Sequence, residues 1–181
     1  MSDKSWRGVL NRFKAAPPGI QRYFEHVPHL AEHLPWDVTL AYLFAQVELA
    51  HNMTLYCAAV KLHHAEASST WSAVQRHHMT RGEFRRLFES IVGVPLDPVV
   101  VALLTHAERT RDGIMHGKPP READKRRAVV DVIAYAEQFN NFVDRHAGLR
   151  PFGTWRGFKG RGKALDKSTT RWMLKGMGFS A

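Results

Sequence analysis

Apolar residues recur along most of the chain every three to four positions, which is the spacing of one helical face. Sustained alternation of polar and apolar residues, the mark of a half-buried strand, is missing. The longest apolar stripe lies within residues 38–79 and consists of Leu40, Leu43, Phe44, Val47, Ala50 and Leu55. Because so long a helix is unusual in a globular domain, we expect it to break near Ser68, Ser69 and Thr70.

Capping signals predict where two of the helices begin. Asp37 precedes the long apolar stripe and is placed to cap its first turn. Thr80 stands three residues before Glu83, which is the pattern of a capping box and predicts a short helix after it. These signals and the helical spacing together predict an all-α, antiparallel helical bundle.

Two further helices are predicted in the second half of the chain. Asp97 and Pro98 offer an N-cap and a proline at the first helical position. The helix that they start should run to His116, where Gly117 closes it. A last helix is expected over residues 121–147.

Charge is concentrated at the C-terminal end of the sequence. The 181 residues hold 26 Lys and Arg against 17 Asp and Glu, a formal charge of +9 that favours polyanionic partners such as nucleic acid. Residues 148–181 contain eight Lys and Arg but a single acidic residue, Asp166. This charge difference separates a basic aromatic tail (148–181), and Asp37 at the start of the long apolar stripe separates an N-terminal helical extension (1–36) from a helical bundle (37–147).

Cysteine content and hydropathy indicate the compartment. Cys57 is the single cysteine, which excludes an internal disulfide and any zinc site built from several cysteines. Neither a signal-peptide core nor an apolar run long enough for a membrane span is present in the sequence. We expect a cytoplasmic protein without membrane contact, in which Cys57 is a core residue.

Arg111, Asp112 and His116 are the candidates for chemistry. On a helical wheel Arg111 falls within the apolar stripe of its helix, where a charge is costly unless it is paired. Asp112 and His116 are four residues apart, a spacing that lets a carboxylate orient an imidazole. His116 lies about 140° around the helix from Arg111, so the two side chains do not start on the same side of it. Two structural interpretations therefore remain open: Arg111 forms an internal ion pair, and Asp112 and His116 form a surface contact.

The segment Arg111-Asp112-Gly113-Ile114-Met115-His116 resembles the R-x4-6-H signature of the HEPN superfamily (higher eukaryotes and prokaryotes nucleotide-binding). Members of that superfamily are all-α bundles and often metal-independent ribonucleases. The resemblance covers roughly residues 37–147. It implies that His116 acts on the ribose 2′-hydroxyl or the leaving oxygen, that Arg111 binds phosphate and that Asp112 orients one of them. It also implies a homodimer in which two such motifs share one cleft, with no cofactor and no metal.

The tail interleaves aromatic residues with cations, the composition of a surface that binds single-stranded nucleic acid. The residues expected to contact RNA are Trp155, Arg156, Phe158, Lys159, Arg161 and Lys163. The alternative is a tail that packs its aromatic residues onto the bundle. Glu32, Glu48, Glu66 and Glu137 are expected to lie on solvated helix faces.

Three functions follow from these patterns. The first is a metal-independent endoribonuclease of HEPN type that uses Arg111 and His116 in a dimeric cleft, as a toxin or phage-defence effector with a possible cognate antitoxin. The second is an RNA- or protein-binding helical module without turnover. The third is a metal-binding bundle whose ligands would come from the histidines His26, His29, His33, His63, His64, His77 and His78.

Overall fold

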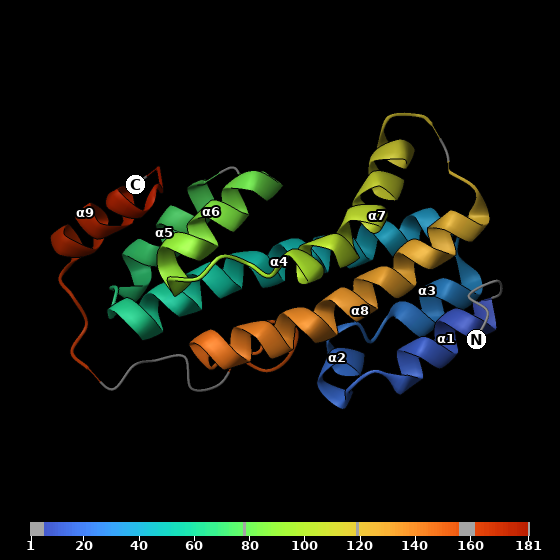
Figure 1. Cartoon of the computed structure of the whole chain (residues 1–181), viewed down its shortest axis with the longest axis horizontal. Helices are drawn as coiled ribbons and strands as arrows, with labels where there is room; N and C mark the ends of the chain where they lie inside the picture. The colour runs from blue at the N-terminus through green and yellow to red at the C-terminus, as the bar shows by residue number, and fades with distance from the viewer. Residues whose placement is uncertain (1–5, 78, 119, 156–161, 181) are drawn as a thin grey trace. The chain divides into compact units, whose positions relative to one another are not determined.

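All regular structure in the described part of the chain is helical (Figure 1). The computed structural model describes residues 6–77, 79–118, 120–155 and 162–180. In chain order the helices are α1 (Trp6–Ala15), α2 (Pro18–Tyr23), α3 (Val27–His33), α4 (Trp36–His63), α5 (Ala67–Arg76), α6 (Arg81–Val92), α7 (Pro98–Met115), α8 (Glu122–Ala147) and α9 (Lys167–Met177). The predicted all-helical fold is confirmed.

The chain forms two compact units, and each is built from two separate stretches of sequence. Unit 1 comprises residues 1–48 and 97–141, and unit 2 comprises residues 49–96 and 142–181. The long helices α4 and α8 each pass from unit 1 into unit 2. The boundaries after residues 48 and 141 therefore fall inside helices and the one after residue 96 falls between α6 and α7, whereas the sequence predicted divisions after residues 36 and 147.

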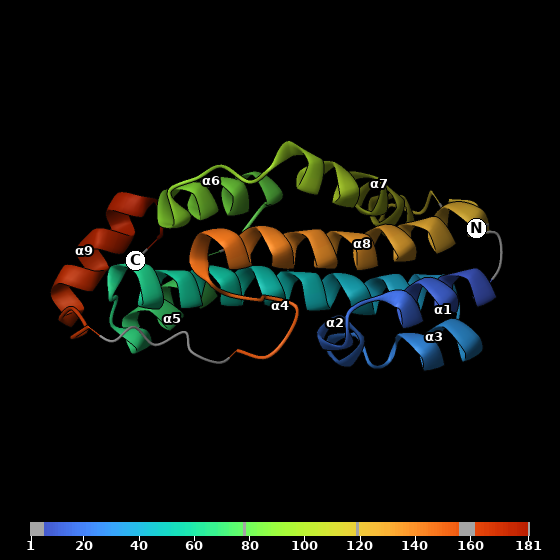
Figure 2. The ribbon, with the colours of Figure 1, turned by 60° about the horizontal axis from the view of Figure 1, so that its bottom comes forward.

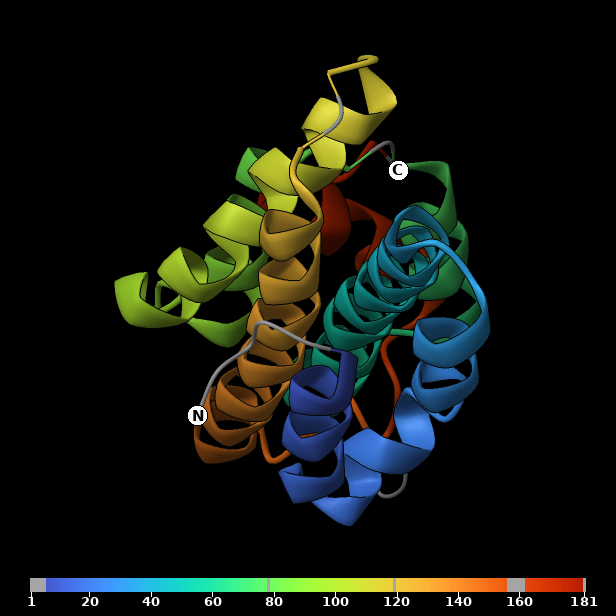
Figure 3. The same ribbon diagram turned by 90° about the vertical axis from the view of Figure 1, so that its right-hand side faces the viewer.

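Unit 1 contains α1 to α3, α7 and the first parts of α4 and α8. Within it α1 and α3, drawn in blue in Figure 3, pack against each other. Arg12 of α1 is joined to Glu137 of α8 by an ion pair of 2.8 Å, so Glu137 is not the purely solvated residue that the sequence suggested.

Asp37 does not cap α4 as predicted, because the helix already begins at Trp36. The backbone carbonyl of Pro35 accepts the first amide protons, from Val38 and Thr39. The Asp37 carboxylate lies 2.6 Å from the Nζ of Lys125, in the second turn of α8. This long-range ion pair joins the beginnings of α4 and α8. In unit 1 the two helices lie side by side and run in the same direction (Figure 1 and Figure 2), whereas the sequence predicts antiparallel neighbours.

In unit 2 the break after α4 comes slightly earlier than the sequence suggested. α4 ends at His63, and His64 turns the chain with a φ of 55°. Glu66 caps α5, since its carboxylate accepts the amide protons of Ser68 (2.9 Å) and Ser69 (2.7 Å). The serines therefore stand in the first turn of α5, and Glu66 has a capping function that was not expected.

The remaining predicted helix ends are confirmed. Thr80 and Glu83 form a complete capping box at the start of α6. Asp97 accepts the amide proton of Val99 at 2.7 Å and caps α7, whose first residue is Pro98. None of the helices in the described ranges is both long and apolar enough to cross a membrane.

The basic tail is built into unit 2. Leu149 and Phe152 are buried directly after α8, and Leu174 of α9 and Phe179 beyond it are buried as well. α9 packs against α5 and α6 (Figure 2). The alternative in which aromatic residues of the tail pack onto the bundle is thus correct for Phe152 and Phe179.

Candidate functional site

Arg111 lies between α7 and α4 in unit 1, partly buried on the apolar side of α7. Its side chain is 28% exposed, and Cζ lies 4.7 Å from the ring centroid of Phe44. Nε and Nη2 donate to Oδ1 of Asp112 at 3.2 and 2.9 Å, and Nη1 lies 3.6 Å from Oε1 of Glu48. Two carboxylates and an aromatic face thus compensate the charge, as its place in the apolar stripe requires.

Asp112 orients Arg111 rather than His116. The carboxylate accepts both of the Arg111 hydrogen bonds given above. The contact that the structure shows between Asp112 and His116 is the backbone bond from the His116 amide to the Asp112 carbonyl, at 3.0 Å. The polar residue of the Arg-Asp-x-x-x-His sequence therefore positions the guanidinium group in this structure.

His116 is exposed at the C-terminal end of α7. The turn after it is a Schellman motif: the amide of Lys118 donates to the Gly113 carbonyl at 2.8 Å, and Gly117 adopts a φ of 68°. A Cβ at Gly113 would lie 2.9 Å from the Lys118 carbonyl oxygen, so this close approach requires glycine. The two glycines around His116 thus hold the imidazole at a defined, solvent-accessible helix end.

One chain does not bring Arg111 and His116 together. His116 follows Arg111 by five positions, which turns the helix by about 140°, so the side chains start from different sides of α7. Among the described residues, no hydrogen bond or ion pair joins the two side chains. The sequence motif is therefore present with its two polar groups apart, as the helical wheel predicts.

The residues expected to bind RNA through the tail are only partly described. Arg156, Phe158, Lys159 and Arg161 lie outside the described residues. Trp155 is half-buried, and Lys163 is exposed. Of this group, Lys163 alone is shown to be exposed.

The net charge of the protein resides in unit 2. The sequence of unit 2 holds fourteen Lys and Arg against five Asp and Glu, whereas unit 1 holds twelve of each. The formal charge of +9 thus belongs to unit 2, while the unit that contains Arg111 and His116 is formally neutral. Electrostatic attraction of a polyanion is expected to come mainly from unit 2.

A histidine on α7 that the sequence did not single out also has a carboxylate partner. Nδ1 of His106 lies 2.7 Å from Oδ2 of Asp131 on α8, and Arg127 approaches the same oxygen to 4.0 Å. Such a bond fixes the imidazole tautomer and leaves Nε2 directed elsewhere. Because the partners stand 25 residues apart on two helices, no local spacing could have revealed this pair.

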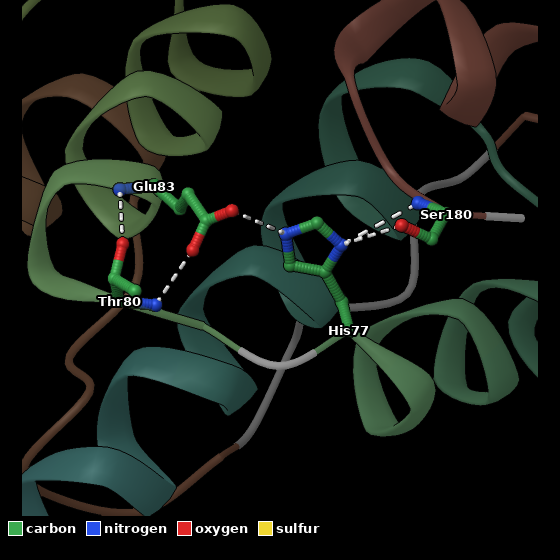
Figure 4. Close-up of polar contacts among 4 residues, drawn as sticks. All are labelled: His77, Thr80, Glu83 and Ser180. Carbon is green, nitrogen blue, oxygen red and sulfur yellow. Dashed lines mark hydrogen bonds and ion pairs between the residues drawn. The ribbon is translucent and has the colours of Figure 1, made fainter.

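A serine, a histidine and a glutamate meet in unit 2 (Figure 4). The amide nitrogen and Oγ of Ser180 both lie 3.4 Å from Nδ1 of His77, and Oε1 of Glu83 lies 4.0 Å from Nε2. Since Nδ1 has one lone pair and accepts the amide proton, it is poorly placed to take the hydroxyl proton as a general base. We interpret the group as an anchor that holds the end of the chain beside α6.

The histidines and the cysteine show no metal or nucleophile site in the described ranges. The rings of His29 and His33 lie 4.8 Å apart on α3. No third ligand joins them, and the described residues contain no cluster of three metal-binding side chains. Burial raises the pKa of the Cys57 thiol to about 12, which keeps it protonated, in line with its predicted core position.

The chain was compared with protein-family models, curated proteins and solved structures. No family model, no curated protein and no solved structure matches it.

Proposed function

We propose that the protein is a metal-independent endoribonuclease of HEPN type, whose catalytic groups are His116 and Arg111. The observation that carries the proposal is the local structure of the Arg-Asp-x-x-x-His sequence. The imidazole is exposed at a helix end fixed by two glycines, and the arginine five residues before it is oriented by the adjacent aspartate. A polar residue that holds the arginine matches what the resemblance implies for Asp112.

The reaction needs a base, an acid and a cation. The ribose 2′-hydroxyl loses its proton and its oxygen attacks the adjacent phosphorus, while the bond to the 5′-oxygen breaks and that oxygen is protonated. His116 serves as acid or base in these transfers, which typically contributes about 10² to 10⁴-fold to the rate. Arg111 stabilises the charge on the phosphoryl oxygens. The products are a 2′,3′-cyclic phosphate and a 5′-hydroxyl.

A second copy of the chain supplies what one α7 cannot. In a two-fold dimer, His116 of one protomer can face Arg111 of the other, which removes the obstacle of their 140° separation. α7 exposes a large apolar side chain next to His116, that of Met115, which is 75% exposed. Such a side chain is suited to an interface at this end of the helix. Light scattering at micromolar concentration should give a dimer mass, and a monomer mass would contradict the dimeric cleft.

A second candidate function is RNA binding without turnover. It is favoured by the contacts of Arg111, because Asp112 and Glu48 already occupy the guanidinium group that a phosphate would need. Both candidates share RNA as partner and a cytoplasmic location. A role as toxin or phage-defence effector, with a cognate antitoxin, belongs to the first candidate alone and rests on the resemblance.

The two candidates differ in whether His116 is needed for cleavage. Purified protein is incubated with a mixed RNA in excess chelator, and fragments are tested for 2′,3′-cyclic phosphate ends. We expect His116→Ala to lower the cleavage rate by about 10² to 10⁴-fold with an unchanged circular dichroism spectrum, because His116 is exposed.

Two histidine variants serve as controls. His29→Ala, at an exposed position of α3, should cleave as fast as the wild type. His106→Ala tests the other histidine of α7 and should also retain activity. If the wild type cleaves no RNA, or His116→Ala cleaves at the wild-type rate, the nuclease proposal fails and the binding module replaces it.

A further inference from the structure

Trp172 is the most exposed large apolar side chain of the described residues, with 78% of its surface accessible. It lies in the middle of α9, whose opposite side buries Thr170 and Leu174. An indole in this position gains nothing from the packing of its own unit. Its exposure leaves the aromatic face accessible to a ligand, and the neighbouring charges decide which ligand would fit.

The surroundings of Trp172 are cationic. Around α9, Lys175 stands about 60° and Arg171 about 100° from Trp172, on the same side of the helix. Both are exposed, as are Lys163 and Lys167 before them. The one acid of the tail, Asp166, directs its carboxylate to the amides of Ser168 and Thr169 as the N-cap. The tryptophan thus borders a basic edge without an acidic side chain of α9.

α9 presents this surface on a fixed helix. The Thr170 hydroxyl accepts the amide proton of Glu66 at 3.0 Å, and the amide of Leu165 donates to the His64 carbonyl at 2.8 Å. Leu174 and Phe179 are buried in unit 2. A stacking residue on such a fixed helix loses little conformational entropy when it binds.

The chemistry of the surface favours one class of ligand. Membrane insertion would need a broad apolar face, whereas the residues beside Trp172 on the exposed side are Ser168, Thr169 and Gly176. An aromatic face with cations on one side fits a chain of stacked bases joined by phosphates. The formal charge of +9 in unit 2 supplies attraction for such a chain.

We propose that α9 is a binding site for single-stranded nucleic acid, in which one base stacks on Trp172 while Arg171 and Lys175 contact neighbouring phosphates. The proposal rests on the RNA-directed function proposed above and adds a site for the substrate strand in unit 2. It assigns affinity to unit 2 and leaves cleavage to His116 and Arg111.

The test separates stacking from charge with two DNA probes. A ten-nucleotide oligo(dT) and an abasic oligodeoxynucleotide of the same length carry equal charge, and neither has the 2′-hydroxyl that the proposed cleavage needs. Binding is measured by fluorescence anisotropy at fixed salt. Trp172→Ala should weaken oligo(dT) binding by about 5- to 150-fold and change binding of the abasic probe by less than about twofold. Trp172→Phe should restore most of the affinity for oligo(dT).

The controls address charge and tryptophan content. Trp6→Ala removes another exposed tryptophan, in unit 1 beside Arg7, and should bind both probes like the wild type. The double variant Arg171→Ala/Lys175→Ala should weaken binding of both probes. It should also reduce the log-log salt slope by about 0.7 for each phosphate that the protein no longer neutralises.

Four outcomes would overturn the site. They are no binding of oligo(dT) by the wild type, no effect of Trp172→Ala, an equal loss for both probes, and Trp172-dependent binding of poly-glutamate as tight as that of oligo(dT). The last outcome would assign α9 to an acidic protein partner. Because DNA is not cleaved by the proposed reaction, these results stand apart from whether the protein cuts RNA.

Discussion

Units 1 and 2 divide charge and candidate chemistry between them. Unit 1 holds Arg111 and His116 but has equal numbers of acidic and basic residues. Unit 2 carries the net charge and the exposed Trp172. A catalytic arginine acts through its position at the charge that develops in the transition state, whereas affinity for a polyanion grows with each cation that contacts it. In the function proposed above, attraction and chemistry would be carried by different parts of this chain.

The strongest test of this comparison asks whether the charged tail is part of the fold. Leu174 is fully buried and holds α9 to unit 2. We expect Leu174→Ala to lower the free energy of unfolding by about 2–5 kcal/mol, measured by urea denaturation, and to speed amide exchange in α9. Val99→Ala, at an exposed position of α7, should change it by less than about 0.5 kcal/mol. If Leu174→Ala were as stable as the wild type, α9 would not contribute to the stability of unit 2.

A smaller effect concerns pH and unit 2. His51 stacks on Phe84 with ring centroids 3.8 Å apart, and desolvation lowers its pKa from 6.5 to about 3. Below pH 6.5 this histidine therefore binds a proton in the unfolded chain but not in the folded chain. Folding stability accordingly falls as the pH falls from about 6.5 towards 3. The loss from this one group is at most about 1.4 kcal/mol per pH unit.

The variant His51→Phe keeps an aromatic ring and removes the titration. Its free energy of unfolding relative to the wild type should rise as the pH is lowered from 7 to 5, in urea denaturation at each pH. The matched variant His29→Phe, at an exposed histidine of unit 1, should show no such trend. Equal pH profiles for His51→Phe and the wild type would contradict the lowered pKa.

The smallest effect tests the neutral character of unit 1. Glu48 is 70% exposed and lies 3.6 Å from Arg111, so Glu48→Gln should change stability by less than about 1 kcal/mol. Removing its charge frees the guanidinium for phosphate, and RNA binding should tighten by about two- to fivefold. Glu32→Gln, an exposed acid of α3, is the control and should leave affinity unchanged. Weaker binding by Glu48→Gln would show that Glu48 positions Arg111 for RNA.

Local signals predicted most helix ends and failed where a partner from afar took part. The capping box of Thr80 and Glu83 and the cap at Asp97 involve atoms within a few residues, so the sequence contains all that forms them. Asp37 carries the same type of local signal, yet its carboxylate binds Lys125 of α8, which is distant in the sequence but close in the fold. Sequence spacing cannot tell which of two possible partners wins such a competition.

The candidate site shows the same limit. The sequence identified Arg111 as a charge that needs compensation, and it assigned Asp112 to orient one of the two functional residues. It correctly placed Glu48 on a solvated face but named no partner for it, and it overlooked His106, because the partners of both lie on other helices. Of the two partners that the sequence left open for Asp112, the structure shows Arg111, whose guanidinium offers two donors to one carboxylate.

The sequence by itself determined that this protein is helical, where most of its helices begin and end, and that its net charge is strongly positive. Periodicity and caps depend on neighbouring residues, and net charge depends on composition alone, so all three can be determined without knowing the fold. The tertiary structure alone decided that the charge belongs to one unit, that Phe179 anchors the tail while Trp172 stays exposed, and that Glu48 approaches Arg111. Each of these depends on which helices pack together, and long-range packing is not encoded in any local spacing.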